Sequence, residues 1–491
     1  MLICGEENAP TLKEVVSKVT RCESCTDQLS LDSDLESLHP LVLKEGYFSE
    51  VDVKTISRKL ENSRRPEWAL LPRIYIILCR IGRLDLMPTF LKEDLTDILI
   101  PFDVPLLRQL VKGREEILEF LKAQEMVLSR HFLPEEHQYF IDGNDHFQEV
   151  RKLGSGGFGS VSHCIDPVSK MAVAKKIIRR GQVILRNRSK DYTNLYQREL
   201  AVLRRISKKR NRHLVSLIGS YTDATHFAIL SLPVADMNLA TYLDTMPDLG
   251  NIAHWFGCLA TTLQFLHNAK IRHKDVKPQN CLVHGDNIIL TDFGLSLDWS
   301  EKSRPTTSGR VEAQDRQYCA PEVAEWEQRN ESSDIWGLGC VYLEMYSVLH
   351  GYSRKSIKEY FINHGSQSSW YQRNKEALKS WLYCLSEKAS KENGQRQRTL
   401  SASWLRYRVA ETYPLNLIQR MVSFHKYKRP TSEELVKEMF SLSGVSRKVR
   451  RTFCGRCCIN EYNKCTESPE EESDESDEED WTLITETDFD F

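Results

Sequence analysis

The first chemically informative segment, residues 154–161, reads GSGGFGSV. Its spacing fits the pattern G-x-G-x-x-G-x-V through Gly154, Gly156, Gly159 and Val161. Glycine lets the backbone approach a triphosphate because no Cβ stands in the way. A strand-like run follows the glycines at 160–165, where a dinucleotide-binding fold would need a helix. The pattern predicts a β-hairpin over a nucleotide, although a plain glycine-rich hairpin stays an alternative.

A lysine and a glutamate further along have the charges that phosphate binding requires. Lys176 lies in the strand-like run VAKKII, and Glu199 lies in the helical run YQRELAVLRRI. We expect them to form an ion pair that presents a fixed positive charge to the α- and β-phosphates. Alternation along a strand points only one of Lys175 and Lys176 inward, and the A-x-K spacing from Ala174 favours Lys176. Taken singly, either charge would more often be a solvated surface group.

The most specific signal is the run IRHKDVKPQNCLV at 271–283, followed by LTDFG at 290–294. Together these runs resemble the catalytic loop and magnesium-binding motif of eukaryotic-type protein kinases, and the resemblance extends to APE at 320–322 and SSDIWGLG at 332–339. Lys277 makes the loop similar to the serine/threonine type. The runs HLVSLIGSY and SSDIWGLGCVYLEM resemble those of kinases of filamentous fungi. The resemblance implies an α+β, bilobal protein kinase fold with a β-rich N-lobe and a helical C-lobe.

The same resemblance implies roles for four side chains. Asp275 would accept or orient the proton of the substrate hydroxyl, and Lys277 would steady the transferring phosphoryl group. Asn280 and Asp292 would hold two magnesium ions. The implied activity is that of a signalling protein serine/threonine kinase, a transferase that moves the γ-phosphoryl of ATP to hydroxyl groups of protein substrates. The implied cofactors are ATP and Mg²⁺.

The resemblance also places an adenine site and one structural ion pair. Leu232 and Val234 would offer backbone hydrogen bonds to adenine, with Ser231 at the back of the nucleotide pocket. Glu322 would pair with Arg429. These residues are expected to shape the fold and the pocket without taking part in phosphoryl transfer.

Two residues depart from the family pattern. Lys274 stands where an arginine usually precedes the catalytic aspartate, and a lysine cannot reproduce the bidentate fork by which arginine binds a phosphate. Asp315 stands where serine/threonine kinases usually carry a threonine, so an extra carboxylate beside Asp275 could repel it or favour a basic substrate. Both departures motivate an alternative hypothesis, a pseudokinase scaffold that binds nucleotide or a partner without phosphoryl transfer.

The elements that must position these residues suggest four parts. Helical periodicity between 67 and 132 predicts a small helical region within 1–144, which could be a regulatory module. Short strand-like runs begin near 147, and strands and helices alternate from 200, which predicts a kinase domain over 145–440. A basic, cysteine-rich segment follows at 441–466. The acidic tail 467–491 is expected to be disordered, because it has too little apolar surface to offset its ordering entropy.

Composition limits the remaining classes of function. Apolar residues make up 41% and charged residues 28%, as in soluble globular proteins. We find no run of about 18 uncharged apolar residues and no secretory signal, and therefore expect an intracellular protein, cytoplasmic or nuclear. The net charge of -2 includes 13 Asp and Glu in 467–491, so the preceding residues carry +11. The basic run at 208–212 could bind nucleic acid, but its charge is the only feature that supports this. We therefore expect no nucleic-acid partner.

The segment before the tail holds four cysteines: Cys454, Cys457, Cys458 and Cys465. Four thiolates could bind zinc, although C-x-x-C-C is an unusual spacing for a zinc site. Palmitoylation beside the basic patch would instead attach the chain to a membrane through Cys454, Cys457 or Cys458. The favoured prediction is ordinary reduced cysteines without membrane attachment.

Overall fold

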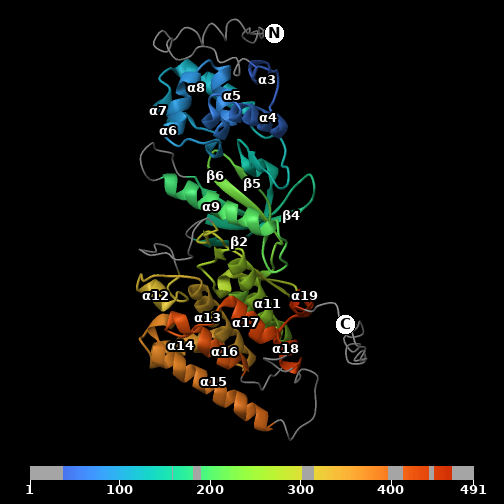
Figure 1. Cartoon of the computed structure of the whole chain (residues 1–491), viewed down its shortest axis with the longest axis vertical. Helices are drawn as coiled ribbons and strands as arrows, with labels where there is room; N and C mark the ends of the chain where they lie inside the picture. The colour runs from blue at the N-terminus through green and yellow to red at the C-terminus, as the bar shows by residue number, and fades with distance from the viewer. Residues whose placement is uncertain are drawn as a thin grey trace. The chain divides into compact units, whose positions relative to one another are not determined.

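The computed structural model describes residues 37–156, 159–180, 189–300, 315–395, 413–441 and 447–466. These residues form two compact units (Figure 1). The first unit comprises the described residues up to 242, together with 269–300 and Asp315. The second unit comprises 243–268 and the described residues from 316 onward. The predicted acidic tail, 467–491, lies outside the described residues.

The first unit begins with a small helical region, as predicted. Its α-helices are α3 (His39–Val42), α4 (Glu50–Glu61), α5 (Pro72–Arg80), α6 (Met87–Lys92), α7 (Val104–Leu110) and α8 (Arg114–Glu125). Short 3-10 helices connect them: η1 (Pro66–Leu70), η2 (Leu84–Leu86) and η3 (Asp97–Leu99), with η4 (Gly143–His146) further on. The rings of Phe90, Phe102 and Phe120 pack against one another at centroid distances of 5.7, 5.9 and 6.2 Å. These aromatic contacts give the helices a core of their own.

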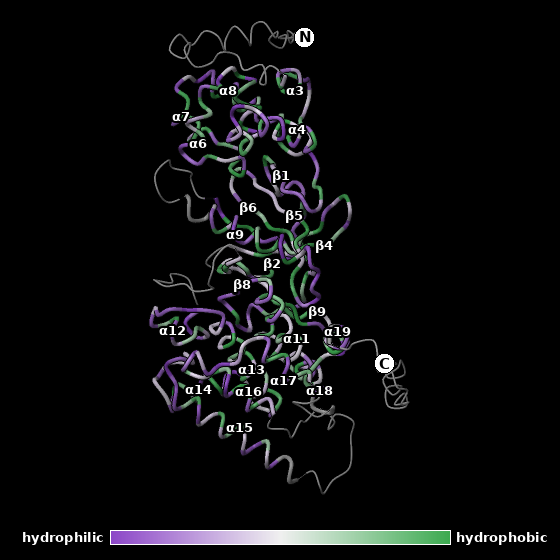
Figure 2. Tube along the Cα trace, viewed as in Figure 1, coloured by the Kyte–Doolittle hydropathy of each residue, from purple (hydrophilic) through white to green (hydrophobic). Residues whose placement is uncertain are grey.

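A six-stranded sheet follows, in the spatial order β1-β5-β6-β4-β3-β2. Its strands are β1 (His137–Tyr139), β2 (Gln148–Gly156), β3 (Gly159–Ile165), β4 (Ala172–Arg179), β5 (Ser216–Thr222) and β6 (His226–Leu232). Neighbouring strands are antiparallel except β1 and β5, which are parallel. The apolar stretch of β6 is green in Figure 2, and Phe227 through Leu230 are buried. The core of the sheet therefore includes this central strand.

Two sets of contacts tie the sheet to its surroundings. Helix α9 (Ser189–Ser207) packs on β4 and β5, and the ring of Tyr196 stacks on that of Phe227 at 4.6 Å. Arg180, directly after β4, donates from Nη1 to the carbonyl oxygen of Pro101 at 2.9 Å. The helical region and the sheet are thus joined within one unit.

Short elements frame the residues between 236 and 300. They are β7 (Met237–Asn238), α10 (Leu239–Leu243), β8 (Ile271–Arg272), η5 (Pro278–Asn280), β9 (Cys281–His284), β10 (Asn287–Leu290) and β11 (Leu297–Asp298). Strands β10, β9 and β7 form one small sheet, and β11 pairs with β8 in another. The loop from 273 to 280 is therefore held at both ends by paired strands.

The second unit is helical. Its α-helices are α11 (Leu249–Asn268), α12 (Pro321–Ala324), α13 (Ser332–Leu349), α14 (Arg354–His364), α15 (Lys375–Gln395), α16 (Tyr413–Met421), α17 (Ser432–Phe440), α18 (Arg447–Phe453) and α19 (Arg456–Thr466). It also contains η6 (Tyr371–Arg373) and η9 (Lys426–Lys428). Most residues of α13 are apolar, and they lie on every side of the helix. Residues 333–349 can therefore all be buried. The predicted β-rich part followed by a helical part is confirmed.

The ion pair expected between Glu322 and Arg429 is present in this second unit. The guanidinium donates to both carboxylate oxygens, at 2.7 and 2.9 Å, and it lies over the ring of Trp336. Thr431 and Glu434 form the capping box that begins α17. The ion pair that the family resemblance implied is therefore present, at 107 residues of sequence separation.

Candidate active site

Lys176 lies between two carboxylates. Its Nζ donates to Oε1 of Glu199, on α9, at 2.7 Å and to Oδ1 of Asp292 at 2.8 Å. The predicted ion pair with Glu199 is confirmed, and Asp292 is a second partner. Strand β4 directs Lys176 to the face of the sheet on which Glu199 and Asp292 lie. Lys175 points to the opposite face and donates to Asn144 at 3.2 Å. Alternation along the strand therefore separates the two lysines as expected.

The two carboxylates that share Lys176 are not electrostatically equal. Burial opposes the charge of Lys176, but Glu199 and Asp292 outweigh it and raise the pKa of the ammonium. Burial raises the pKa of Glu199, and the charge of Asp292 adds to this effect against the opposing effect of Lys176. Burial also opposes the charge of Asp292, but Lys176 outweighs it and lowers the pKa of that carboxyl. Asp292 is therefore the carboxylate held most firmly in its ionised, cation-binding form.

The glycine-rich segment forms the predicted hairpin. Strands β2 and β3 pair so that Gly154 faces Val161 and Gly156 faces Gly159, while residues 157 and 158 lie outside the described residues. Gly159 has φ +148°, and a Cβ there would meet the carbonyl oxygen of Ile177 at 2.0 Å. A Cβ on Gly154 would meet no atom within 4 Å, so the chain itself does not require glycine there. That open space suits the close approach of a ligand.

Asp275 is held by two neighbours from its own loop. Asn280, at the end of η5, donates from Nδ2 to Oδ2 of Asp275 at 2.9 Å and to its carbonyl oxygen at 2.8 Å. Lys277 Nζ lies 2.8 Å from the same Oδ2. Because Asn280 donates through Nδ2, its Oδ1 is the atom that would bind a cation.

Backbone bonds join this loop to Asp292. The N–H of Thr291 donates to the carbonyl oxygen of Asn280 at 2.9 Å. The Nε2 atom of His273 lies 2.9 Å from the carbonyl oxygen of Thr291, and its ring contacts that of Phe293. Asp292 has φ +64°, a left-handed conformation that aspartate tolerates better than most residues. Sequence reasoning assigned no role to His273 or Thr291, although both lie within the quoted runs at 271–283 and 290–294.

Asp315 is the second carboxylate near Lys277. Its Oδ2 is 3.5 Å from Lys277 Nζ. Burial opposes the charge of Lys277, but Asp275 and then Asp315 outweigh it and raise the pKa of the ammonium. The additional carboxylate expected beside Asp275 therefore shares the lysine that Asp275 also binds, so its charge is partly offset.

The expected adenine site lies at the end of β6. Ser231 pairs with Ala174 and Leu217, and Leu232 pairs with Ser216. Leu232 and Val234 are both half-buried. Their hydrogen bonds to adenine stay a prediction.

Fold and site together define the class of the protein. The sequence matches the protein kinase domain family over residues 147–441, which is more than half of the chain. The chain therefore belongs to the protein kinase family and is a protein kinase by fold, with a β-rich part, a helical part and a preceding helical region.

Three relatives illustrate the family. A probable cell division protein kinase of Encephalitozoon cuniculi is 32% identical over 198 residues, covering 40% of this chain and 69% of the relative. The catalytic subunit 3 of cAMP-dependent protein kinase of Drosophila melanogaster is 28% identical over 204 residues, which cover 41% of this chain and 33% of the relative. Mitogen-activated protein kinase 14 of Xenopus laevis is 28% identical over 211 residues, which cover 41% of this chain and 54% of the relative. The match thus spans a third to about a half of the last two relatives.

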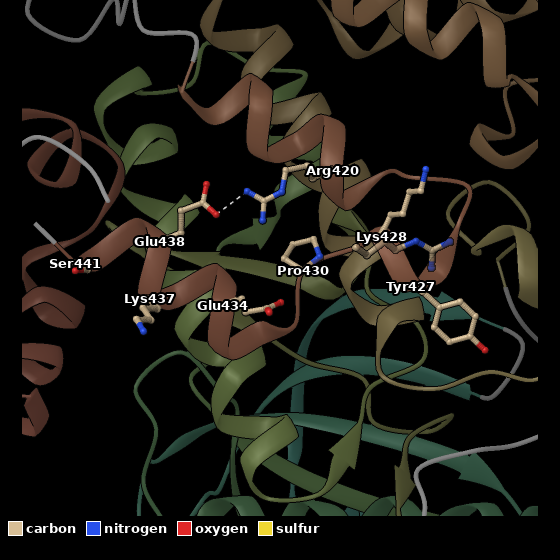
Figure 3. Close-up of a pocket in the computed structure, with 9 residues that line it drawn as sticks. Arg420, Tyr427, Lys428, Pro430, Glu434, Lys437, Glu438 and Ser441 are labelled. Atoms are coloured by element: carbon tan, nitrogen blue, oxygen red, sulfur yellow. Dashed lines mark hydrogen bonds and ion pairs between the residues drawn. The ribbon is translucent and has the colours of Figure 1, made fainter. Parts of the chain in front are cut away.

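A separate hollow of about 520 Å³ lies on the second unit (Figure 3). It is lined by Arg420, Tyr427, Lys428, Arg429, Pro430, Glu434, Lys437, Glu438 and Ser441. The ion pair between Arg420 and Glu438, at 2.7 Å, lies along it, and Arg429 is bound to Glu322. Its arginine charges are therefore already paired.

None of the described helices is both long and apolar enough to cross a membrane.

Proposed function

We propose that this chain is a serine/threonine kinase that transfers the γ-phosphoryl of ATP to hydroxyl groups of proteins. The observation that carries the proposal is the convergence of Lys176, Glu199, Asp275, Lys277, Asn280 and Asp292 within one unit. Phosphoryl transfer needs positive charge around the phosphate groups and an aligned oxygen nucleophile, and these six side chains supply both. The serine/threonine type is supported by Lys277.

Each side chain has a role that its surroundings support. Asp275 Oδ2, fixed by Asn280 and Lys277, would accept or orient the proton of the substrate hydroxyl. Lys277 would steady the phosphoryl group during transfer, while Lys176, fixed by Glu199, would bind the α- and β-phosphates.

The cofactors fit the side chains present. Asp292 and the Oδ1 of Asn280 are hard oxygen ligands of the kind that Mg²⁺ prefers, and the lowered pKa of Asp292 keeps it an anion. Gly154, Gly156, Gly159 and Val161 would cover the triphosphate, and the backbone of Leu232 and Val234 would bind adenine. When bound, ATP supplies the transferable group and Mg²⁺ neutralises charge on its phosphates.

The test compares purified full-length wild type with Asp275→Asn. Both proteins are given labelled ATP, magnesium and a general basic protein acceptor, and both autophosphorylation and acceptor labelling are recorded. We expect labelling by the wild type on serine and threonine, and a loss of about 10²–10⁴-fold in Asp275→Asn. Phosphotyrosine as the sole product would overturn the serine/threonine assignment.

The alternative is a pseudokinase scaffold, motivated by Lys274 and Asp315. Lys274, immediately before Asp275, has a left-handed backbone conformation with φ +70°. Asp315 competes with Asp275 for the ammonium group of Lys277. A wild-type protein that binds ATP in a thermal-shift assay but transfers no phosphate would support this alternative.

A further inference from the structure

We propose that Cys258, Cys457 and Cys458 form a structural zinc site that fastens the end of the described chain to helix α11. The sequence of the C-terminal segment suggested zinc binding only by Cys454, Cys457, Cys458 and Cys465, with an awkward spacing. The structure brings in Cys258, which is 199 residues from Cys457 along the chain. The site is independent of the proposed phosphoryl transfer.

The geometry of the three sulfur atoms matches a metal site. Cys258 Sγ and Cys457 Sγ are 3.7 Å apart, Cys457 Sγ and Cys458 Sγ are also 3.7 Å apart, and all three lie within 4.8 Å of one another. Zinc binds thiolates tetrahedrally at about 2.3 Å, which places neighbouring sulfur atoms about 3.8 Å apart. A disulfide would require about 2.05 Å, and none of the three cysteines is bridged.

Two glycines allow the helices to approach closely enough. A Cβ on Gly455, between α18 and α19, would meet Cys457 Sγ at 2.9 Å and Cys258 Sγ at 3.0 Å. A Cβ on Gly257 of α11 would meet Sγ of Cys454 at 2.8 Å. Gly455 therefore keeps space beside two of the three sulfur atoms, and Gly257 lets α11 approach the residue before Gly455.

The surroundings suit a bound cation with three thiolates. Cys258 and Cys458 are buried and Cys457 is half-buried, so three bare thiolates would repel one another without a cation. Zn²⁺ with three thiolates carries a net charge of about −1. Cys457 and Cys458 are the second and third residues of α19, an eleven-residue helix whose amino-terminal dipole favours negative charge. Thr261 Oγ1 donates to Cys458 Sγ at 3.3 Å, a supporting hydrogen bond from α11.

The location explains what such a metal would do. Helices α18 and α19 lie beyond residue 441, where the family match ends, and both contact α11. A metal held by one cysteine of α11 and two of α19 would make this segment part of the folded helical unit. The same burial argues against palmitoylation of Cys454 and Cys458, which are 1% and 2% exposed.

The test begins with the metal content of the full-length chain purified under reducing conditions. We expect about one zinc per chain, and cobalt(II) substitution should give thiolate-to-metal charge-transfer absorption. X-ray absorption should show three sulfur neighbours and identify the fourth ligand. A protein that contains no zinc, takes up none and gives no such absorption with cobalt(II) would refute the site. So would a Cys258–Cys457 disulfide found after alkylation and mass spectrometry.

Variants separate the site from cysteine chemistry in general. Cys258→Ser and Cys457→Ser should lose most of the metal, whereas the control Cys384→Ser, which changes an exposed cysteine on α15, should retain it. Gly455→Ala keeps every sulfur atom, and it should weaken zinc affinity at least about 10-fold in competition with a chromophoric chelator. This variant keeps the proposal testable if the serine variants do not fold. Unchanged affinity in Gly455→Ala together with retained metal in Cys258→Ser would overturn the assignment.

Discussion

Lys176 and Lys277 each contact two carboxylates. Both contacts of Lys176 are short, and we call this the closed arrangement. Lys277 has one short and one longer contact, and we call this the open arrangement. The two distances at Lys176 are nearly equal, 2.7 Å to Glu199 and 2.8 Å to Asp292. At Lys277 they differ, with 2.8 Å to Asp275 and 3.5 Å to Asp315. The side chain of Glu199 is 5% exposed, whereas those of Asp292 and Asp315 are 36% and 30% exposed.

The difference indicates which part of the site can vary. A buried ion pair has a fixed geometry and is costly to break, because removal of one partner leaves an uncompensated charge. A half-exposed carboxylate is screened by water and can be replaced at low cost. Asp315, one of the two departures from the family pattern, lies in the open arrangement. We therefore infer that Lys176 serves the handling of ATP, while Asp315 can adapt the site to its substrate.

The largest expected effect comes from removing each lysine. Lys176→Met and Lys277→Met should both reduce kcat/KM by about 10²–10⁴-fold, because each removes a cation that we propose to act on the phosphates. Lys176→Met should also destabilise the fold more than Lys277→Met, by about 3 kcal/mol, because it leaves the buried carboxylate of Glu199 without its counter-charge. Steady-state kinetics and thermal unfolding of both variants would test this. Equal destabilisation by the two substitutions would remove the distinction between closed and open arrangements.

A smaller effect is expected at Asp315. Asp315→Thr should leave phosphate transfer measurable and should raise the KM for a basic peptide about 5- to 10-fold at low salt, because an exposed carboxylate attracts cationic side chains. Asp315→Glu is the control that keeps the charge. The test is the KM for peptides of opposite charge at two salt concentrations. A gain in kcat of about a hundredfold or more in Asp315→Thr would instead mean that Asp315 blocks transfer, as in the scaffold alternative.

Much of the site could be predicted from the sequence because its spacings are short. Asp275 and Asn280 are five residues apart in one loop, so their hydrogen bond follows from the motif. Lys176 and Glu199 are 23 residues apart, but each lies in an element with a clear period, strand and helix. Where local periodicity and a known motif agree, contacts follow without a structure.

The missed features depend on long-range packing. Strand β1 has only three residues, too few to show a period, yet it joins the sheet parallel to β5. Cys258 has the sequence signature of an ordinary core cysteine, because nothing along the chain connects α11 to Cys457. The division at residue 144 stays a prediction, although Arg180 bonds the helical region and the sheet within one unit.

The closed arrangement also predicts a pH dependence of stability. The folded-state pKa of Glu199 is raised above 4.5, so the folded protein holds this proton where the unfolded chain has lost it. The free energy of unfolding should therefore fall as pH rises from 4.5 through the raised pKa. Asp292, with its pKa lowered from 3.8, acts below this window, and its contribution is lost as pH falls through the lowered value. From pH 4.5 upward through this window, the Tm of Glu199→Gln should rise by about 1–3 °C relative to the Tm of the wild type.

The measurement is thermal unfolding of wild type and Glu199→Gln in the absence of nucleotide across that pH range. Two parallel curves would show that the proton on Glu199 is not linked to folding. The control Glu119→Gln, which removes an exposed carboxylate from α8, should follow the wild-type curve.

The smallest effect is expected at Lys175, the neighbour of Lys176 on β4. Its side chain lies on the opposite face, is 2% exposed and donates to Asn144 at 3.2 Å. Lys175→Met should leave kcat/KM within about twofold of wild type and lower Tm slightly, because Asn144 loses one hydrogen-bond donor. Kinetics of Lys175→Met beside Lys176→Met compare the same substitution at adjacent positions. If Lys175→Met abolished transfer and Lys176→Met did not, the strand register that places Lys176 between its two carboxylates would be wrong.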